Sequence, residues 1–195
     1  ARQASIKAGI PSSVGAITVS KVCGSGMQAA MLAHDGIIAD TYGVVVAGGM
    51  ESMTNAPYLL TKARGGYRAG HATMYDHMML DGLEDAYQVG RAMGTFGEDC
   101  AAKYGFTREE QDTFAVESVS RAQKAARDGV LKWETVPVTI KSKKGDTVIE
   151  LDERPQKLNV EKIPTLKPAF AANGTITAAS SSGNADGAAA LVLMR

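Results

Sequence analysis

The sequence predicts an α/β protein, and three consecutive segments lead to that prediction. Residues 15–22 are rich in side chains that favour strands, and residues 24–39 are small and apolar, as in a buried helix. Residues 43–49 form a short apolar run that two glycines close. Such a run is typical of a strand covered on both faces, as in a parallel sheet. The three segments therefore predict a strand–helix–strand unit.

The elements around this unit follow from local signals. Residues 1–10 are predicted to be the end of a helix, because Gly9 and Pro11 follow an amphipathic stretch. The helix at 24–39 is apolar almost all round, so we expect it to be buried.

From about residue 54 the sequence is rich in Gly, Met, Tyr and charge, and its weak periodicity predicts an irregular, partly helical excursion. A clear helix follows, where Thr107 and Glu110 form a capping-box pattern and Gly129 marks the end. Glu117 and Arg121 are spaced as an i,i+4 ion pair. The side predicted to be apolar carries Phe114, Ala115, Val119, Ala122 and Ala126.

The last third of the chain predicts two strands around a Lys-Gly-Asp turn within residues 134–153. An extended connection with several prolines follows at 154–170, and a buried strand of small and apolar residues ends the chain. The order is thus core, long insertion, core. Because the chain starts without Met and ends on a predicted core strand, we expect it to be part of a larger protein.

Composition excludes several classes of function. The 195 residues include 21 basic and 21 acidic side chains, which is unlike a nucleic-acid binder. No apolar run approaches the roughly 20 residues that cross a bilayer. Two cysteines do not make a disulfide framework, so we expect a reducing compartment and a free thiol.

Cys23 stands where the first predicted strand turns into the helix. At a helix start it meets unpaired backbone N–H groups and the positive end of the helix dipole, which favour the nucleophilic thiolate. Gly24 and Gly26 leave room for a substrate to approach the backbone. The pattern alone favours the alternative of a buried structural cysteine, because a free Cys often behaves as a small hydrophobe. Cys100 has no flanking glycines and lies in a predicted helix, which favours a structural role.

A cysteine nucleophile usually needs a base, and the chain offers His34, His71 and His77. His34 lies eleven residues along the same helix, about 16 Å away at ~1.5 Å per residue, and is therefore out of reach. His71 and His77 lie in the insertion and could fold over the site, or could be surface residues. No metal-ligand spacing, dinucleotide fingerprint or P-loop is present.

Four blocks in order, KVCGSGMQAA, VAGGMESMTNAPY, DGLEDAY and GTITAASSSGNADGAAALVLM, resemble the thiolase family and most closely its acetyl-CoA acetyltransferase branch. The resemblance runs from end to end of the chain and covers the front half of the family's sequence. It implies a layered α/β core with a mixed sheet and an inserted α+β loop domain. Residues 1–54 would belong to the core, 55–180 to the loop (lid) domain, and 181–195 to a strand that returns to the core.

The resemblance also implies a chemistry. Cys23 matches the cysteine that takes an acyl group from one coenzyme A thioester, and its backbone N–H matches an oxyanion donor. A second thioester then loses a proton next to its carbonyl, and the carbanion attacks the acyl-cysteine. Two acetyl-CoA molecules would give acetoacetyl-CoA and coenzyme A. Coenzyme A thioesters are substrates here, and no permanently bound cofactor is expected.

Further positions are carried over from the family. Ser182 matches the serine that bonds the pantetheine arm of coenzyme A, although it could instead cap a turn. Met93 matches a methionine of the acyl pocket, although it could instead fill a core gap. Many short-chain members have His before that methionine, where this chain has Ala92.

A metal ion is not expected. One mitochondrial branch of the family holds a potassium ion at the positions of Tyr87, Ala178 and Ala179. Ser181 stands where that branch has alanine, so the resemblance implies no ion in this chain.

The family's acid/base groups lie in Gly-His-Pro, Cys-x-Gly-Gly and Asn-Glu-Ala-Phe motifs, and none of these occurs in the 195 residues. Alternatives are a broader 3-ketoacyl-CoA thiolase of fatty-acid breakdown, a non-catalytic coenzyme A or lipid-binding relative, and a cysteine hydrolase. The resemblance implies acyl-CoA substrates, a homo-oligomer (dimer or tetramer) and a cytoplasmic location of bacterial type. No nucleic-acid or membrane partner is expected.

Overall fold

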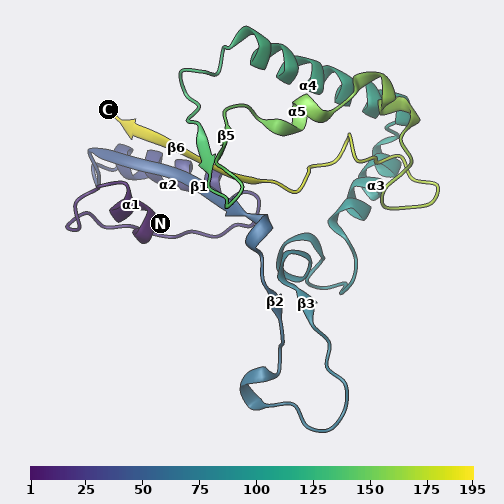
Figure 1. Cartoon of the computed structure of the whole chain (residues 1–195), viewed down its shortest axis with the longest axis horizontal. Helices are drawn as coiled ribbons and strands as arrows, with labels where there is room; N and C mark the ends of the chain where they lie inside the picture. The colour runs from purple at the N-terminus through teal and green to yellow at the C-terminus, as the bar shows by residue number, and fades with distance from the viewer. The chain divides into compact units, whose positions relative to one another are not determined.

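The computed structural model describes all 195 residues (Figure 1). They divide into two compact units. Unit 1 comprises residues 1–82 and 184–195, and unit 2 comprises residues 83–183. The predicted division into 1–54, 55–180 and 181–195 has other boundaries and stays a prediction.

Unit 1 joins both ends of the chain. Its elements are α1 (Arg2–Lys7), α2 (Ser25–Ile38), β1 (Val44–Ser52), the 3₁₀ turns η1 (Met53–Asn55) and η2 (Ala63–Gly65), β2 (Tyr58–Leu59), β3 (Tyr75–Asp76) and β6 (Asp186–Met194). The π-helical turn η3 (Met79–Leu83) leads into unit 2.

The centre of unit 1 is a two-stranded sheet with a helix on one face. β1 and β6 pair antiparallel along nine residues, with Val44 opposite Met194 and Ser52 opposite Asp186. Figure 1 shows α2 running along this pair, and its Ala33 and Ile37 are buried with Ala47 of β1. The α2 helix therefore ends up held against the strand that follows it in sequence.

Two predictions about this unit are wrong. Residues 15–22 form no strand, because no strand of the chain pairs with residues 15–20 and Lys21 and Val22 already belong to the turn before α2. Without that strand there is no strand–helix–strand unit. The strand predicted at 43–49 does form, as β1, but its partner is antiparallel because β6 returns from the far end of the chain.

The burial predicted for α2 and for the strands is also wrong. Met27, Met31 and Ile38 of α2 are exposed, because only one side of the helix meets the sheet. On the sheet, the face that carries Val44, Val46, Val192 and Met194 is exposed, because no second layer of this chain covers it.

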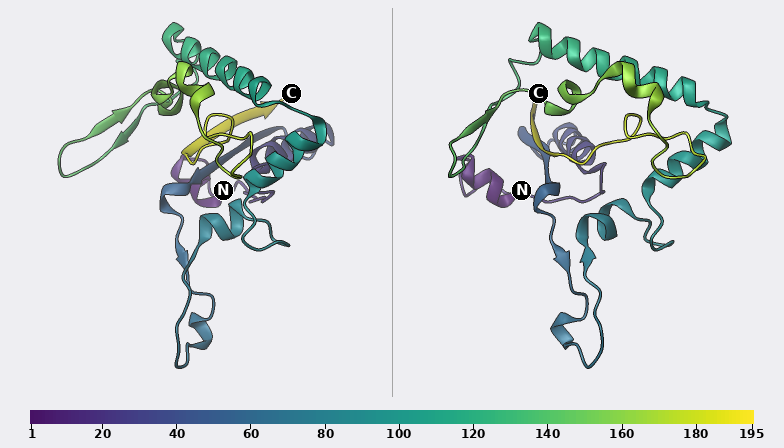
Figure 2. Two further views of the ribbon diagram at one scale, coloured as in Figure 1. Left: turned by 90° about the vertical axis from the view of Figure 1, so that its right-hand side faces the viewer. Right: turned by 45° about the vertical axis from the view of Figure 1, so that its right-hand side comes forward.

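The predicted irregular excursion begins as a thin hairpin. β2 and β3 pair over two residues each, and the loop between them contains only the short turn η2 (Figure 2). Most of its side chains are exposed. This segment therefore has no hydrophobic core of its own.

Unit 2 is built around its longest helix. Its elements are α3 (Met93–Tyr104), α4 (Arg108–Asp128), β4 (Val138–Ile140), β5 (Thr147–Ile149), α5 (Glu153–Lys157) and the 3₁₀ segment η4 (Val160–Thr165). α5 and η4 run along α4 (Figure 2), and Ile163 of η4, 1% exposed, packs with Ala115 and Val119. The predicted pair of strands around the Lys-Gly-Asp turn is confirmed as β4 and β5.

The signals predicted for α4 are largely confirmed. Thr107 and Glu110 form the capping box, Glu117 pairs with Arg121, and Gly129 ends the helix with φ 68°. Phe114 is wrongly placed on the buried side, since it is 77% exposed. The buried stripe runs through residues 112, 115 and 119, and Phe114 lies about 100° around the helix from Ala115.

The connection at 154–170 is more ordered than predicted. Asp152 caps α5 and Asn159 caps η4 through their side chains, so two short helical segments form where an extended chain was predicted. The Gln123 amide of α4 donates to the carbonyls of Pro155 and Leu158 and fixes the turn between them. None of the helices has the length and apolar composition that crossing a membrane requires.

Candidate functional site

Cys23 is the last residue before the N-cap of α2, and its side chain is exposed as a free thiol. It therefore lies two residues before the helix begins at Ser25, not in the first turn itself. A tight turn holds it there. The Gly24 N–H donates to the Lys21 carbonyl at 3.0 Å, and the Ser25 hydroxyl donates to the Val22 carbonyl at 2.7 Å. The Lys21 N–H closes the turn by donating to the Ser25 hydroxyl at 2.8 Å.

The turn forces Val22 into the left-handed region, with φ 48°. A β-branched residue rarely adopts this conformation, which costs on the order of 1–3 kcal/mol and persists only where the surroundings impose it. Here the hydrogen bonds of Ser25 on both sides of Val22 impose it. The local sequence thus presents the next residue, Cys23, in a fixed and exposed position.

Backbone donors lie unused on both sides of Gly24. The N–H groups of Cys23, Gly26 and Met27 donate to no acceptor of the chain, whereas those of Gly24 and Ser25 are taken up within the turn. Free donors at a helix start attract an anion, such as a thiolate or the oxyanion of a tetrahedral intermediate. The arrangement can therefore stabilise negative charge next to the thiol.

No histidine hydrogen-bonds to Cys23. His34 lies on α2 with its ring 3.1 Å from the Asp35 carboxylate, and the His77 ring lies 3.2 Å from Asp81. His71 is exposed in the loop between β2 and β3. The three candidate bases are thus engaged elsewhere or exposed, and none forms the pair that a cysteine hydrolase needs.

Met93 is the first residue of α3 and lies in unit 2, with 40% of its surface exposed. Its surface is thus partly covered and partly accessible, and its assignment to the acyl pocket stays a prediction. Ala92 before it is the N-cap, and a Cβ on Gly94 after it would overlap the ring of Phe170. The start of α3 is therefore pressed against residue 170 while the Met93 side chain stays accessible.

Ser182 also lies in unit 2, directly after a tightly bonded turn. Thr177 is completely buried, and its hydroxyl accepts from the N–H of Ala179 at 3.2 Å. Ser180 accepts from the Thr177 N–H, and the Ser181 hydroxyl donates to the Thr177 carbonyl. The turn is thus capped by Ser180 and Ser181. Ser182 itself is exposed and has no hydrogen bond from its hydroxyl, so the turn-capping alternative does not hold for it.

A carboxylate that the sequence did not point to holds the segment before this turn. Glu98 of α3 accepts from the N–H groups of Thr175 and Ile176 and from the Thr175 hydroxyl, at 2.8–3.2 Å. Burial opposes the charge of Glu98, but these hydrogen bonds outweigh it and hold its pKa below the ordinary value. The sequence around Glu98 could not predict this role, because its partners are backbone amides about 77 residues further along the chain.

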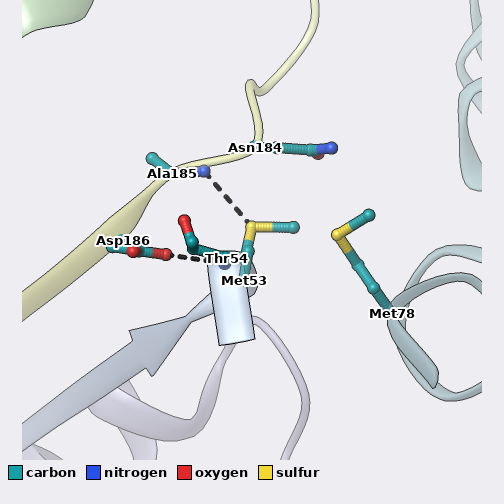
Figure 3. A pocket seen from close by; sticks show the side chains of 6 residues that line it. All are labelled: Met53, Thr54, Met78, Asn184, Ala185 and Asp186. Carbon is teal, nitrogen blue, oxygen red and sulfur yellow. Dashed lines mark hydrogen bonds between the residues drawn. The ribbon is translucent and has the colours of Figure 1, made fainter. Parts of the chain in front are cut away.

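A pocket of about 250 Å³ lies in unit 1 where β1 ends and β6 begins (Figure 3). The Met53 and Met78 thioethers face each other across it, while the Asp186 carboxylate accepts from the Thr54 N–H at 2.9 Å. That hydrogen bond lowers the pKa of Asp186. The Asp186 carboxylate at this pocket is therefore already engaged, and its hydrogen bond from Thr54 joins the end of β1 to the start of β6. The pocket is lined by Met53, Thr54, Met78, Asn184, Ala185 and Asp186.

The residues carried over for a potassium ion lie in unit 2. Tyr87 is 95% exposed at the tip of a loop, and Ala178 and Ala179 lie in the turn after Thr177. No group of three or more His, Cys, Asp or Glu side chains is arranged to hold a metal ion.

Comparisons with known proteins agree on one family. The model of the thiolase N-terminal domain matches residues 1–195. Acetyl-CoA acetyltransferase IA of Candida tropicalis is 48% identical over 197 residues, which cover 100% of this chain and 49% of the relative. The chain spans about half the length of the curated relatives it matches.

Solved structures agree as well. Acetyl-CoA acetyltransferase from Syntrophomonas wolfei superposes with a TM-score of 0.89 at 44% identity, over 99% of this chain and 48% of that one. The Acat5 thiolase from Ascaris suum, solved in complex with coenzyme A, has a TM-score of 0.87 at 40% identity, over 100% of this chain and 49% of that one.

Proposed function

The chain belongs to the thiolase family, and from that premise we propose that it carries the nucleophile and coenzyme A contacts of an acetyl-CoA acetyltransferase. The observation that carries the proposal is the exposed thiol of Cys23, fixed on a strained turn with free N–H donors around it. The fold is the α/β fold predicted from the sequence, and the chain covers about half the length of its relatives.

In the proposed first step, the Cys23 thiolate attacks the carbonyl carbon of acetyl-CoA. A bond forms between Sγ and that carbon, the carbonyl electrons move onto oxygen, and the free N–H groups hold the resulting oxyanion. The intermediate then collapses, the bond to the coenzyme A sulfur breaks, and coenzyme A leaves as a thiolate that takes up a proton. Each oxyanion donor is worth about 10²–10³ in rate.

Ser182 and Met93 are proposed to bind the substrate. The Ser182 hydroxyl has no partner in the chain and is free to hydrogen-bond an amide of the pantetheine arm. The Met93 side chain is accessible at the start of α3 and offers a flexible apolar contact to the acyl group. That the Ascaris relative was solved with coenzyme A supports this substrate class.

The second step, removal of a carbon-bound proton from another acetyl-CoA, needs a base outside the Cys23 turn. In the resemblance that base and its partner belong to Gly-His-Pro and Cys-x-Gly-Gly motifs, which these 195 residues do not contain. We therefore assign condensation to the full-length protein, together with the homo-oligomeric state and the cytoplasmic location that the resemblance implies.

The test is mass spectrometry of the full-length protein after incubation with acetyl-CoA. We expect one acetyl group on the peptide that carries Cys23, none in Cys23→Ser, and a normal level in the matched control Cys100→Ser. Cys100 is also an exposed free thiol, but it lies within α3 away from any helix start. Acetyl transfer that persists in Cys23→Ser would overturn the assignment of the nucleophile.

A further inference from the structure

We propose that Glu98 is a positioning residue that fixes Ser182 relative to Met93, and so sets how tightly acetyl-CoA is held. The inference rests on the proposed function, which gives Ser182 and Met93 to the substrate. All three residues lie in unit 2, so their arrangement belongs to one compact part of the chain.

Glu98 joins two segments that are distant in sequence. Its Oε1 accepts from the N–H of Ile176 at 2.9 Å, and its Oε2 accepts from the N–H of Thr175 at 2.8 Å and from the Thr175 hydroxyl at 3.2 Å. Glu98 stands five residues after Met93 on α3, and Thr175 stands seven residues before Ser182. The Glu98 carboxylate thus connects α3, which carries Met93, to the segment that leads to Ser182.

The segment approaches α3 closely at Gly174. A Cβ at Gly174 would lie 2.7 Å from the Glu98 carboxyl carbon, a distance that real side chains do not tolerate. The Ile176 side chain packs over Gly97 of α3, where a Cβ would lie in ordinary contact with it at 3.6 Å. The backbone of residues 174–176 therefore lies directly on the surface of α3.

The network extends to a second helix. The Thr175 hydroxyl, which donates to Glu98, accepts from the Gln111 amide of α4 at 2.9 Å. Gln111 also donates to the Phe106 carbonyl at the junction of the two helices. Glu98 and Gln111 thus hold one hydroxyl from two sides, which fixes the segment relative to both α3 and α4.

Backbone contacts connect the fixed residues 175–176 to Ser182. The Ile176 carbonyl accepts from the Ala169 N–H at 2.8 Å, and the buried Thr177 organises the turn that ends at Ser181. Ser182 follows without any hydrogen bond of its own hydroxyl, so its position is set by the turn before it. Loss of the Glu98 contacts would therefore loosen Ser182 without removing any group that touches the substrate.

A carboxylate is needed because all of its partners are donors. In Glu98→Gln the side chain keeps its shape and one acceptor oxygen, but in either orientation its NH₂ would face a backbone N–H of Thr175 or Ile176 and could not accept from it. Hydrogen bonds to a charged group are worth about 1.5–3 kcal/mol. The isosteric variant should therefore release the segment while leaving the packing of α3 intact.

The test compares Glu98→Gln with the wild type in the full-length protein, by single-turnover acetylation of Cys23 over a range of acetyl-CoA concentrations. We expect the half-saturating concentration to rise about tenfold, the equivalent of one such hydrogen bond, while the limiting rate stays within about twofold. Hydrogen exchange at the amides of Thr175 and Ile176 should become faster. The matched control is Glu117→Gln, since Glu117 forms an exposed ion pair on α4 and should change neither value.

The outcomes separate the two proposals. If wild-type Cys23 is not acetylated, the proposed function fails and this inference fails with it. If the wild type is acetylated and Glu98→Gln has an unchanged half-saturating concentration, only the inference is overturned. A lower limiting rate with unchanged half-saturation also overturns it, since Glu98 would then act on the chemistry.

A second variant covers the case in which Glu98→Gln fails to fold. Thr175→Val keeps the backbone donor and the side-chain shape but removes the hydroxyl that Glu98 and Gln111 share. A rise of at least about threefold in the half-saturating concentration is expected, since the hydroxyl's hydrogen bond to the Glu98 carboxylate and the one from the Gln111 amide are both lost. No rise in this variant would overturn the inference.

Discussion

At the scale of single residues, the Cys23 turn depends on three neighbouring residues, which together hold the thiol in place. The Ser25 hydroxyl hydrogen-bonds to the Lys21 N–H and to the Val22 carbonyl, on both sides of Val22. Val22 is thereby held at a strained φ of 48°, and the Cys23 thiol is fixed in an exposed position. Gly24 contributes by packing on Lys21, whose carbonyl lies 3.4 Å from where a Cβ would be. The strain is maintained because the Ser25 hydroxyl satisfies two backbone groups at once.

Cys23 should react with iodoacetamide at least about tenfold faster than Cys100 near pH 7, because Cys23 is held on an exposed turn beside free backbone N–H donors, whereas Cys100 lies within α3. Both thiols are exposed, so accessibility alone does not separate them. Peptide mass spectrometry over a time course measures both rates in one sample. Equal labelling of the two cysteines would contradict the role of the turn.

Glu98 should make stability depend on pH in acid. Its folded pKa is held below the ordinary value of 4.5 by the hydrogen bonds of Thr175 and Ile176, so the unfolded chain binds more protons. The stabilisation is fully present above pH 4.5 and is lost as the pH falls through the folded pKa. The difference in unfolding free energy between wild type and Glu98→Gln should shrink between pH 7 and pH 3. Urea titrations at both pH values measure it, and a constant difference would argue against the charge.

At the scale of elements, signals that act within a few residues predicted the structure well. The capping box and C-terminal glycine of α4 lie within or beside its own turns, and both were found in the sequence. A strand needs a partner, and nothing in residues 15–22 tells whether the chain supplies one. Likewise, the pairing of β1 with β6 joins residues about 140 positions apart, so the two strands could be predicted from local sequence but their antiparallel pairing could not. Cys23 could be found from its glycines, whereas Glu98 could not, because its partners are backbone amides.

The pairing of β1 with β6 should be sensitive at Gly48. A Cβ there would overlap the Ala189 carbonyl oxygen of the partner strand and lie 3.0 Å from the Ala190 Cα. Because neither backbone atom can move aside freely, Gly48→Ala should lower the unfolding free energy by about 1–3 kcal/mol.

Gly187→Ala is the matched control for this change. Gly187 lies in the same ladder, opposite Glu51, but a Cβ there meets nothing within 4 Å. We expect a change of less than about 0.5 kcal/mol for it in urea titrations of the full-length protein. Equal effects at the two glycines would show that the strands do not approach as closely as the structure has them.

At the scale of the whole molecule, the step proposed for this chain is acylation of Cys23, and the proposed condensation depends on motifs that these 195 residues do not contain. In the proposal, the turn of Cys23 supplies the nucleophile and oxyanion donors, and unit 2 supplies Ser182 and Met93. His34, His71 and His77 form no hydrogen bond to Cys23. Acylation and condensation should therefore be separable in the laboratory, because they depend on different parts of the complete protein.

The isolated 195-residue chain should accept an acetyl group from acetyl-CoA on Cys23 but should not form acetoacetyl-CoA at a measurable rate. Removal of a carbon-bound proton depends on a positioned base, which typically contributes about 10²–10⁴ in rate. Mass spectrometry follows the acyl-cysteine, and a condensation assay follows acetoacetyl-CoA in the same samples, with the full-length protein as the positive control. Robust condensation by the isolated chain would mean that His34, His71 or His77 acts as the base. Triple substitution of these histidines by Gln would then abolish it, and the division of roles proposed for Cys23 and the motifs outside this chain would be wrong.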